Sequence, residues 1–163
     1  ETIVFDIYPC EAGGGYHYDF TRTWCLGYAP DPVQALYQDV RQVFDHVRSS
    51  LEINAPFKSY QDLTCALFEA RGHRTIHNYP QTEEGYVHSL GHGLGLQVHE
   101  RPISGSMAGE TDRLFPGVVV TVEPGIYLPH WGGVRLEDDI LVTRDGHEVL
   151  SSLPKELESC VVS

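Results

Sequence analysis

Four acidic residues lie within or at the ends of apolar, strand-like stretches, and their placement constrains the fold most strongly. They are Asp6, Asp19, Glu123 and Glu137. Carboxylates that converge inside a sheet repel one another and raise one another's pKa unless cations are bound between them. The pattern therefore favours a fold in which distant strands meet around two divalent ions. An edge or turn position would explain either aspartate alone equally well.

The stretch from His88 to Glu100 is the second marked feature, because it places three histidines among glycines. The middle one, His92, has Gly91 and Gly93 on either side. Imidazole is a common metal ligand, and glycines allow the close approach of another group. A lone histidine is more often a hydrogen-bonded core residue, but the four carboxylates supply further ligands. Oxygen ligands with one imidazole and no cysteine favour manganese or cobalt over a structural zinc site.

Length, charge and cysteine spacing narrow the class of protein. The 163 residues predict a single domain over residues 1–163, and the formal charge is -12. This charge argues against binding to nucleic acid or to an anionic membrane surface, whereas cations or peptides suit it. No apolar run approaches the roughly 18 residues that span a bilayer. The four cysteines are scattered, which predicts neither a zinc cluster nor a disulfide scaffold and favours a cytoplasmic location.

Hydrophobic periodicity predicts a mixture of strands and helices. Residues 2–8 and 16–26 are expected to form a hairpin whose register stays open, and residues 118–123 and 133–142 are expected to be strands. Helices are predicted from an Asp31 N-cap to about residue 50, and over residues 59–71 from a weak capping box of Ser59 and Asp62. Neither helix is expected to carry chemistry, and the tail from Pro154 onward is expected to be peripheral.

At this point four motifs together resemble a known family, the metallopeptidases with the pita-bread fold, which include methionine aminopeptidase, aminopeptidase P and prolidase. The motifs are Asp6 with Gly15–Thr23, His88–Pro102, Thr121–Tyr127 and Gly133–Asp138. The resemblance implies an α+β fold with a curved, mostly antiparallel sheet and helices on its outer face. The chain starts without methionine at the strand that bears Asp6. We therefore expect a piece of a longer polypeptide, with the N-terminal part of the domain missing and a sheet face uncovered.

The resemblance also implies a site with two divalent metal ions. Its five ligands would be Asp6, Asp19, His92, Glu123 and Glu137. Asp6 would bind one ion, His92 and Glu123 the other, and Asp19 and Glu137 would bridge the pair. A hydroxide held between the ions would attack the peptide bond. Manganese is the expected metal, with cobalt or zinc as alternatives.

Further roles follow for residues around these ligands. Glu123 is expected to move the proton of the attacking water towards the leaving amine, and His99 and His88 to donate hydrogen bonds to the substrate and the tetrahedral intermediate. Arg135 would neutralise a carboxylate or steer the substrate. His17 is more readily explained as an exposed residue.

Two motifs point to the prolidase and aminopeptidase P branch of this family. They are Glu123–Tyr127 and Val134–Asp139, in which Arg135 stands where methionine aminopeptidases usually have glutamine. The implied substrates are short peptides with proline at the second position, and the implied assembly of the full-length protein is a homodimer. A non-catalytic peptide-binding module and a methionine aminopeptidase remain the alternatives, and the chain alone is expected to have little activity.

Overall fold

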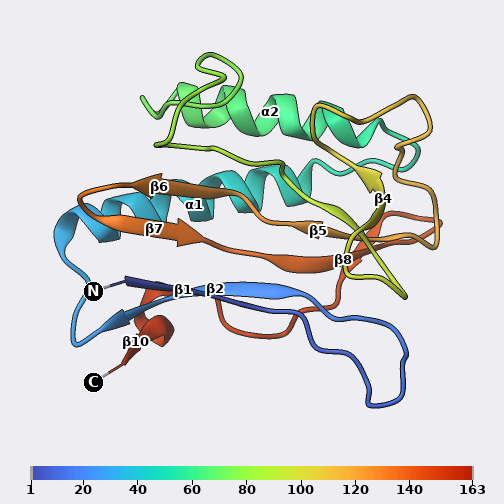
Figure 1. Ribbon diagram of the computed structural model, residues 1–163, viewed down its shortest axis with the longest axis horizontal. Helices are drawn as coiled ribbons and strands as arrows, with labels where there is room; N and C mark the ends of the chain where they lie inside the picture. Colours follow the sequence, from blue (N-terminus) through green and yellow to red (C-terminus); the bar gives the residue numbers. More distant parts are fainter. Residues whose placement is uncertain (1, 163) are drawn as a thin grey trace.

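The strands of the chain form three sheets, against which two helices pack (Figure 1). This computed structural model describes residues 2–162. A three-stranded sheet has the order β1-β2-β10, a five-stranded sheet the order β4-β3-β5-β8-β9, and a two-stranded sheet pairs β6 with β7. All neighbouring strands are antiparallel except β10 and β2, which run parallel. The predicted mixed fold with mostly antiparallel sheets is confirmed.

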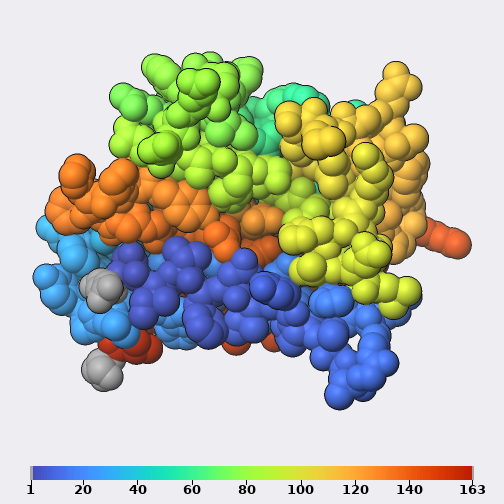
Figure 2. Space-filling view, in the orientation of Figure 1, coloured from blue at the N-terminus to red at the C-terminus, as the bar shows by residue number. Residues whose placement is uncertain are grey.

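The predicted hairpin forms from β1 (Thr2–Ile7) and β2 (Phe20–Leu26). The register left open by the sequence pairs Asp6 with Thr21. The second strand starts later than expected, so Asp19 lies just before it. Beyond the hairpin loop, the His17 amide donates a hydrogen bond to the Gly95 carbonyl (2.8 Å). This contact joins the hairpin to the glycine-rich segment after the histidines, and Figure 2 shows that segment in yellow against the blue hairpin.

The first helix, α1 (Asp31–Ser49), buries the predicted apolar stripe that includes Val40, Phe44 and Val47. The predicted Asp31 N-cap is wrong by one residue. Pro30, with an extended backbone, is the N-cap, and Asp31 is the first helical residue. A carboxylate in the first turn still interacts favourably with the positive end of the helix dipole.

The second helix, α2 (Phe57–Glu69), begins two residues before the predicted start. The predicted capping box is absent from it. The Ser59 hydroxyl donates to the Pro56 carbonyl (2.7 Å), and Asp62 forms an ion pair with Lys58 one turn away (2.6 Å). Phe57 is fully buried, so core packing extends the helix beyond the point that local side-chain signals indicate. Within residues 2–162, neither helix meets the length and apolarity required to cross a membrane.

The strands that position the site lie between the helices and the hairpin (Figure 1). They are β3 (His92–Leu94), β4 (Glu100–Ile103), β5 (Val119–Val122), β6 (Gly125–Leu128), β7 (Gly132–Arg135), β8 (Asp138–Val142) and β9 (His147–Val149). The strand predicted over 133–142 is broken at Leu136 and Glu137. Their amides bond to the carbonyls of Pro124 and Thr21. Before this break the chain pairs with β6, as β7, and after it the chain pairs with β5, as β8.

One face of the hairpin sheet is apolar and exposed. Phe5 is 52% exposed and Ile3 is 40% exposed. With Ile7, Phe20 and Trp24 they line a shallow cavity of about 470 Å³. The uncovered sheet face expected from the sequence is therefore present. The main core lies on the other side, between the helices and strands β5 to β8.

The tail from Pro154 onward is not peripheral, contrary to the prediction. It forms a short 3₁₀ helix (Leu157–Cys160) and then β10 (Val161–Val162), which extends the hairpin sheet. Arg22, 1% exposed, donates to the carbonyls of Pro154 (3.0 Å) and Leu153 (2.9 Å) and pairs with buried Asp138 (2.7 Å). A buried guanidinium needs such acceptors; the tail supplies one of them, and Leu153, directly before the tail, supplies the other.

Candidate metal centre

Three of the five predicted ligands come together at the junction of the hairpin and the main sheet. Asp19, His92 and Glu137 each offer a ligand atom, and these atoms lie within 4.8 Å of one another. The fourth, Glu123, follows directly after β5, and its Oε1 lies 3.4 Å from His92 Nε2. All four line a cavity of about 220 Å³ together with Asp6, Tyr8, Val98 and His99. Residues far apart in sequence thus converge as predicted.

The backbone sets the orientation of the His92 imidazole. Its Nδ1 lies 3.0 Å from the Gly93 carbonyl, which can only accept a hydrogen bond, so Nδ1 carries the proton. Nε2 then presents its lone pair to the carboxylates of Glu123 and Asp19, at 3.4 and 3.8 Å. Burial lowers the pKa of His92. A neutral imidazole with one nitrogen held by a carbonyl is the form that binds metal ions.

Burial and mutual repulsion disfavour the ionised form of the carboxylates. Burial, and then the charges of Asp6 and Asp139, raise the pKa of Asp19 to about 7. Burial also raises the pKa of Glu123 to about 8, and that of Glu137 well above its usual value. Among the described residues, Asp19 Oδ1 is buried and has no hydrogen-bond partner. Buried carboxylates with excess negative charge are stabilised by bound cations, so the donor set fits divalent metal ions.

Asp6 differs from the other four predicted ligands. Its side chain is 39% exposed, and its Oδ2 accepts a hydrogen bond from Arg135 Nη2 (2.7 Å). It lines the same cavity but is not part of the close group of three. The sequence suggested a carboxylate enclosed by an apolar strand, but β1 is an edge strand whose apolar side chains are exposed.

A larger cavity of about 620 Å³ adjoins the first and shares His92, His99 and Glu123 with it. Its wall includes His88 and Arg135 as well as the apolar residues Ile76, Ile103 and Met107. The rings of His92 and His99 meet edge to face, with centroids 4.3 Å apart. The predicted substrate-binding residues therefore lie directly beside the predicted metal ligands.

His88 and Arg135 are joined through a tyrosine that sequence reasoning did not single out. The Tyr127 hydroxyl accepts a hydrogen bond from Arg135 Nη1 (2.7 Å) and lies 3.1 Å from His88 Nε2. Because His88 Nδ1 lies 2.8 Å from the Ser89 carbonyl, Nε2 is the acceptor of the tyrosine proton. Burial lowers the pKa of His88 to about 4, so the ring is neutral at pH 7.

Other residues that hold the ligands were also missed. The Thr21 hydroxyl donates to Glu137 Oε2 (2.5 Å), and the Thr121 hydroxyl donates to Glu123 Oε1 (3.2 Å). Asp139, 1% exposed, accepts the amide hydrogen of Asp19 (3.0 Å). The available signal was spacing, since each residue lies two positions from a predicted ligand and shares its side of an extended chain.

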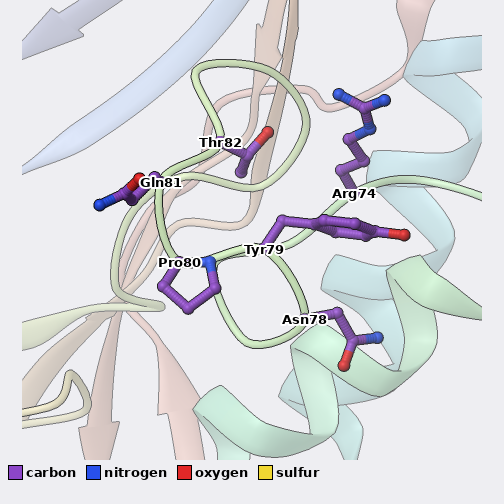
Figure 3. Close-up of a pocket in the computed structure, with 6 residues that line it drawn as sticks. All are labelled: Arg74, Asn78, Tyr79, Pro80, Gln81 and Thr82. Carbon is purple, nitrogen blue, oxygen red and sulfur yellow. The ribbon is translucent and has the colours of Figure 1, made fainter.

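A separate surface hollow of about 580 Å³ lies on the loop of residues 74–82, before the His88–Glu100 stretch (Figure 3). Arg74 and Tyr79 lie side by side there, and the guanidinium is 5.5 Å from the ring centroid. Arg74 also pairs with Glu84 (2.9 Å), so its charge is already balanced. This hollow shares no lining residue with the metal centre.

Comparison with known proteins gives a consistent result. The model of metallopeptidase family M24 matches residues 1–144. A putative dipeptidase of Bacillus subtilis is 41% identical over 144 residues, which are 88% of this chain and 36% of that protein. An uncharacterized peptidase of the same organism is 38% identical over 88% of this chain and 37% of its own length.

Solved structures agree with the sequence relatives. A dipeptidase from Pyrococcus horikoshii matches 99% of this chain and 41% of its own with a TM-score of 0.83 and 30% identity. An Xaa-Pro dipeptidase from Bacillus anthracis matches 90% of this chain and 38% of its own with a TM-score of 0.75 and 35% identity. The chain thus spans about two fifths of the length of these relatives, and it belongs to metallopeptidase family M24.

Proposed function

We propose that the full-length protein is a dinuclear-metal-dependent peptidase that cleaves the bond between an N-terminal residue and proline. The observation that carries this proposal is the convergence of Asp19, His92, Glu123 and Glu137 in one cavity with a surplus of negative charge. Membership of family M24 supports a peptidase, and relatives named Xaa-Pro dipeptidase and X-Pro aminopeptidase support the specificity.

The ligands divide between two ions as the family resemblance implies. Asp6, Asp19, His92, Glu123 and Glu137 would hold the two ions. We favour manganese, with cobalt or zinc as alternatives, because the donors are mainly carboxylate oxygens. When bound, the ions polarise the scissile carbonyl and lower the pKa of a water that becomes the nucleophile.

The chain's own side chains complete the reaction. Glu123 lies beside His92 in the smaller cavity, where it would accept the proton of the attacking water and pass it to the leaving amine. His99 lines both cavities and is placed to donate a hydrogen bond to the substrate carbonyl. His88 and Arg135 would contact the peptide from the wall of the larger cavity. Because His88 Nε2 is an acceptor, it would accept a hydrogen bond from the substrate in place of the one from Tyr127, and not donate one as the sequence suggested.

The larger cavity suits a short peptide with proline at its second position. Ile76, Ile103 and Met107 offer apolar contact for a pyrrolidine ring, and Arg135 offers positive charge for a carboxylate. We further propose that the full-length protein is a cytoplasmic homodimer. The net charge of -12 and the four free cysteines are compatible with that location.

The proposal is tested by metal content and by release of the N-terminal residue. We expect the protein in its full natural length to bind about two manganese ions and to release alanine from Ala-Pro, leaving proline, or from Ala-Pro-Ala, leaving Pro-Ala. Preference between those two peptides separates a dipeptidase from an aminopeptidase. Cleavage of Met-Ala-Ser instead would indicate a methionine aminopeptidase. A folded protein that binds peptide without cleaving it or binding metal would be a binding module.

A further inference from the structure

The backbone around the first site histidine is irregular. Residues 88–91 precede β3 and belong to no strand, although they lie next to the metal centre. Backbone amides and carbonyls that are buried outside a ladder need other hydrogen-bond partners. Gly91 finds them in Ser104, whose hydroxyl lies 3.0 Å from its amide nitrogen and 2.8 Å from its carbonyl oxygen. The partner of His88 and Leu90 comes from further away in the fold.

That partner is Gln61 in α2, a helix that shows no sign of chemistry in its sequence. The segment before β3 runs alongside this helix (Figure 1). Gln61 is 6% exposed, and its Oε1 accepts hydrogen bonds from the Leu90 amide (2.5 Å) and the Tyr86 hydroxyl (3.0 Å). Its Nε2 donates to the His88 carbonyl (3.3 Å). One buried amide therefore holds two residues of the histidine segment.

The contacts of Gln61 continue to the catalytic groups. Gln61 holds the Leu90 amide, and the Leu90 carbonyl, in the next peptide bond, accepts a hydrogen bond from the Glu123 amide (2.8 Å). The Tyr86 ring, whose hydroxyl Gln61 binds, packs edge to face on His88 with centroids 5.2 Å apart. Displacement of this amide would shift both His88 and Glu123.

Another buried polar residue of the same helix behaves differently. Thr64 is fully buried, but its hydroxyl donates to the Tyr60 carbonyl of its own helix (2.7 Å). Thr64 thus satisfies itself within α2. Gln61 also donates to Cys65 Sγ of its own helix (3.7 Å), but its bonds to Tyr86, His88 and Leu90 all go to the segment that carries the histidine. Thr64 therefore stabilises its own helix, whereas Gln61 orients residues of the site.

We propose that Gln61 is a positioning residue that fixes the main chain of His88 and, through Leu90, that of Glu123. The inference rests on the proposed peptidase function for its kinetic consequence, but its structural consequence is independent of activity. Because removal of the amide would break three buried hydrogen bonds, its loss should be measurable both in the kinetics and in the structure.

The kinetic test uses Gln61→Met, which keeps the side-chain length but removes both polar atoms, in the manganese-loaded full-length protein. We expect kcat/KM for the best Xaa-Pro peptide to fall roughly tenfold or more at unchanged metal content. Gln61→Glu keeps the acceptor for Leu90 and Tyr86 and should recover part of the loss. The matched control Thr64→Val should lower the melting temperature without changing kcat or KM.

A double-mutant cycle distinguishes positioning from general destabilisation. If Gln61 acts through His88, Gln61→Met should cost much less in a His88→Ala background than in the wild type. Equal costs in both backgrounds, or a loss of kcat that only follows loss of folded or metal-loaded protein, would overturn the proposal.

A spectroscopic test does not depend on turnover. In the zinc-loaded protein, the imidazole nitrogen resonances of His88, assigned with His88→Ala, should shift in Gln61→Met and stay in place in Thr64→Val. Those of exposed His46 should not move in either variant. An unshifted His88 signal in Gln61→Met refutes the positioning role. A shifted signal in a protein that cleaves no peptide refutes the proposed function instead and leaves the positioning intact.

Discussion

The two sides of the site are built in opposite ways. On one side, Asp19, Glu123 and Glu137 crowd around His92 with raised pKa values and a buried oxygen that lacks a partner among residues 2–162. On the other side, an unbroken chain of hydrogen bonds joins the side chains of His88, Tyr127, Arg135 and Asp6. The first side carries unbalanced negative charge once its carboxylates are ionised. The second is ordered by the protein alone.

The largest expected effect comes from Glu123→Gln, which removes a charge from the crowded side without changing its shape. We expect peptide hydrolysis to fall by about 10³-fold, because a proton-transfer group is lost. Above about pH 8, where Glu123 would otherwise carry a buried repulsive charge, the metal-free protein should become more stable. Initial rates and thermal melts check both results. Exposed Glu148→Gln is the control, and a variant that retains most of its activity would remove Glu123 from the reaction.

Arg135→Met breaks the ordered side. The guanidinium donates to Asp6, Tyr127 and Thr21, so its loss frees Asp6 and leaves the Tyr127 hydroxyl with His88 alone. We expect kcat/KM to decrease about 100-fold, as for removal of one strong donor from an active site. Steady-state kinetics provide the measurement, and Arg144→Met on an exposed turn is the control. An unchanged KM and kcat would show that the network is not used by the substrate.

Gly91→Ala tests how closely the two sides are packed. A Cβ at this position would overlap the Thr121 carbonyl, next to Glu123. We expect the free energy of unfolding to fall by about 1–3 kcal/mol, with weaker metal binding, because β5 must move. Gly109→Ala, whose added carbon would come only within 3.9 Å of Asp112, should be tolerated. Denaturant unfolding and metal titration compare the two, and equal stabilities would contradict the close approach.

The smallest expected effect is a pH dependence of the stability of the metal-free protein, caused by the carboxylates of the crowded side. The folded pKa values of Asp19 and Glu123, about 7 and about 8, lie above their unfolded values of about 4. Their protonation stabilises the metal-free fold, and this contribution decreases as the pH rises above about 4 and is lost above about 8. His88, with a lowered pKa, has the opposite sign but acts only below its unfolded value of 6.5.

We therefore expect the melting temperature of the metal-free protein to drop by about 2–4 °C between pH 6.5 and about 8.5. Saturating manganese should abolish most of this drop, because the ions replace the protons. Calorimetric scans with and without metal make the comparison. A metal-free melting temperature that rises over this interval would contradict the raised pKa values.

The sequence alone was sufficient to predict the features that depend on local residue patterns. The hairpin, the apolar stripe of α1 and the convergence of acidic residues with His92 all follow from periodicity or from unusual residue placement. Features set by distant partners were not predictable. The break between β7 and β8 depends on the Thr21 and Pro124 carbonyls, and the start of α2 depends on the burial of Phe57. The partners of Gln61 also come from another part of the chain.

The structural role of the tail also depends on distant partners, so the sequence did not predict it. This role has a practical consequence. Arg22 lies one residue beyond Thr21, which contacts Glu137, and three beyond Asp19. Proteolytic trimming of the chain just before Leu153 would remove two carbonyl acceptors of buried Arg22, and with them Lys155, which also pairs with Asp138. Arg22 would keep Asp138 and the carbonyls of Thr21 and Glu137. Such nicked protein would lose affinity for metal although every ligand was still present. The integrity of the C-terminal segment would thus be a simple marker of active preparations.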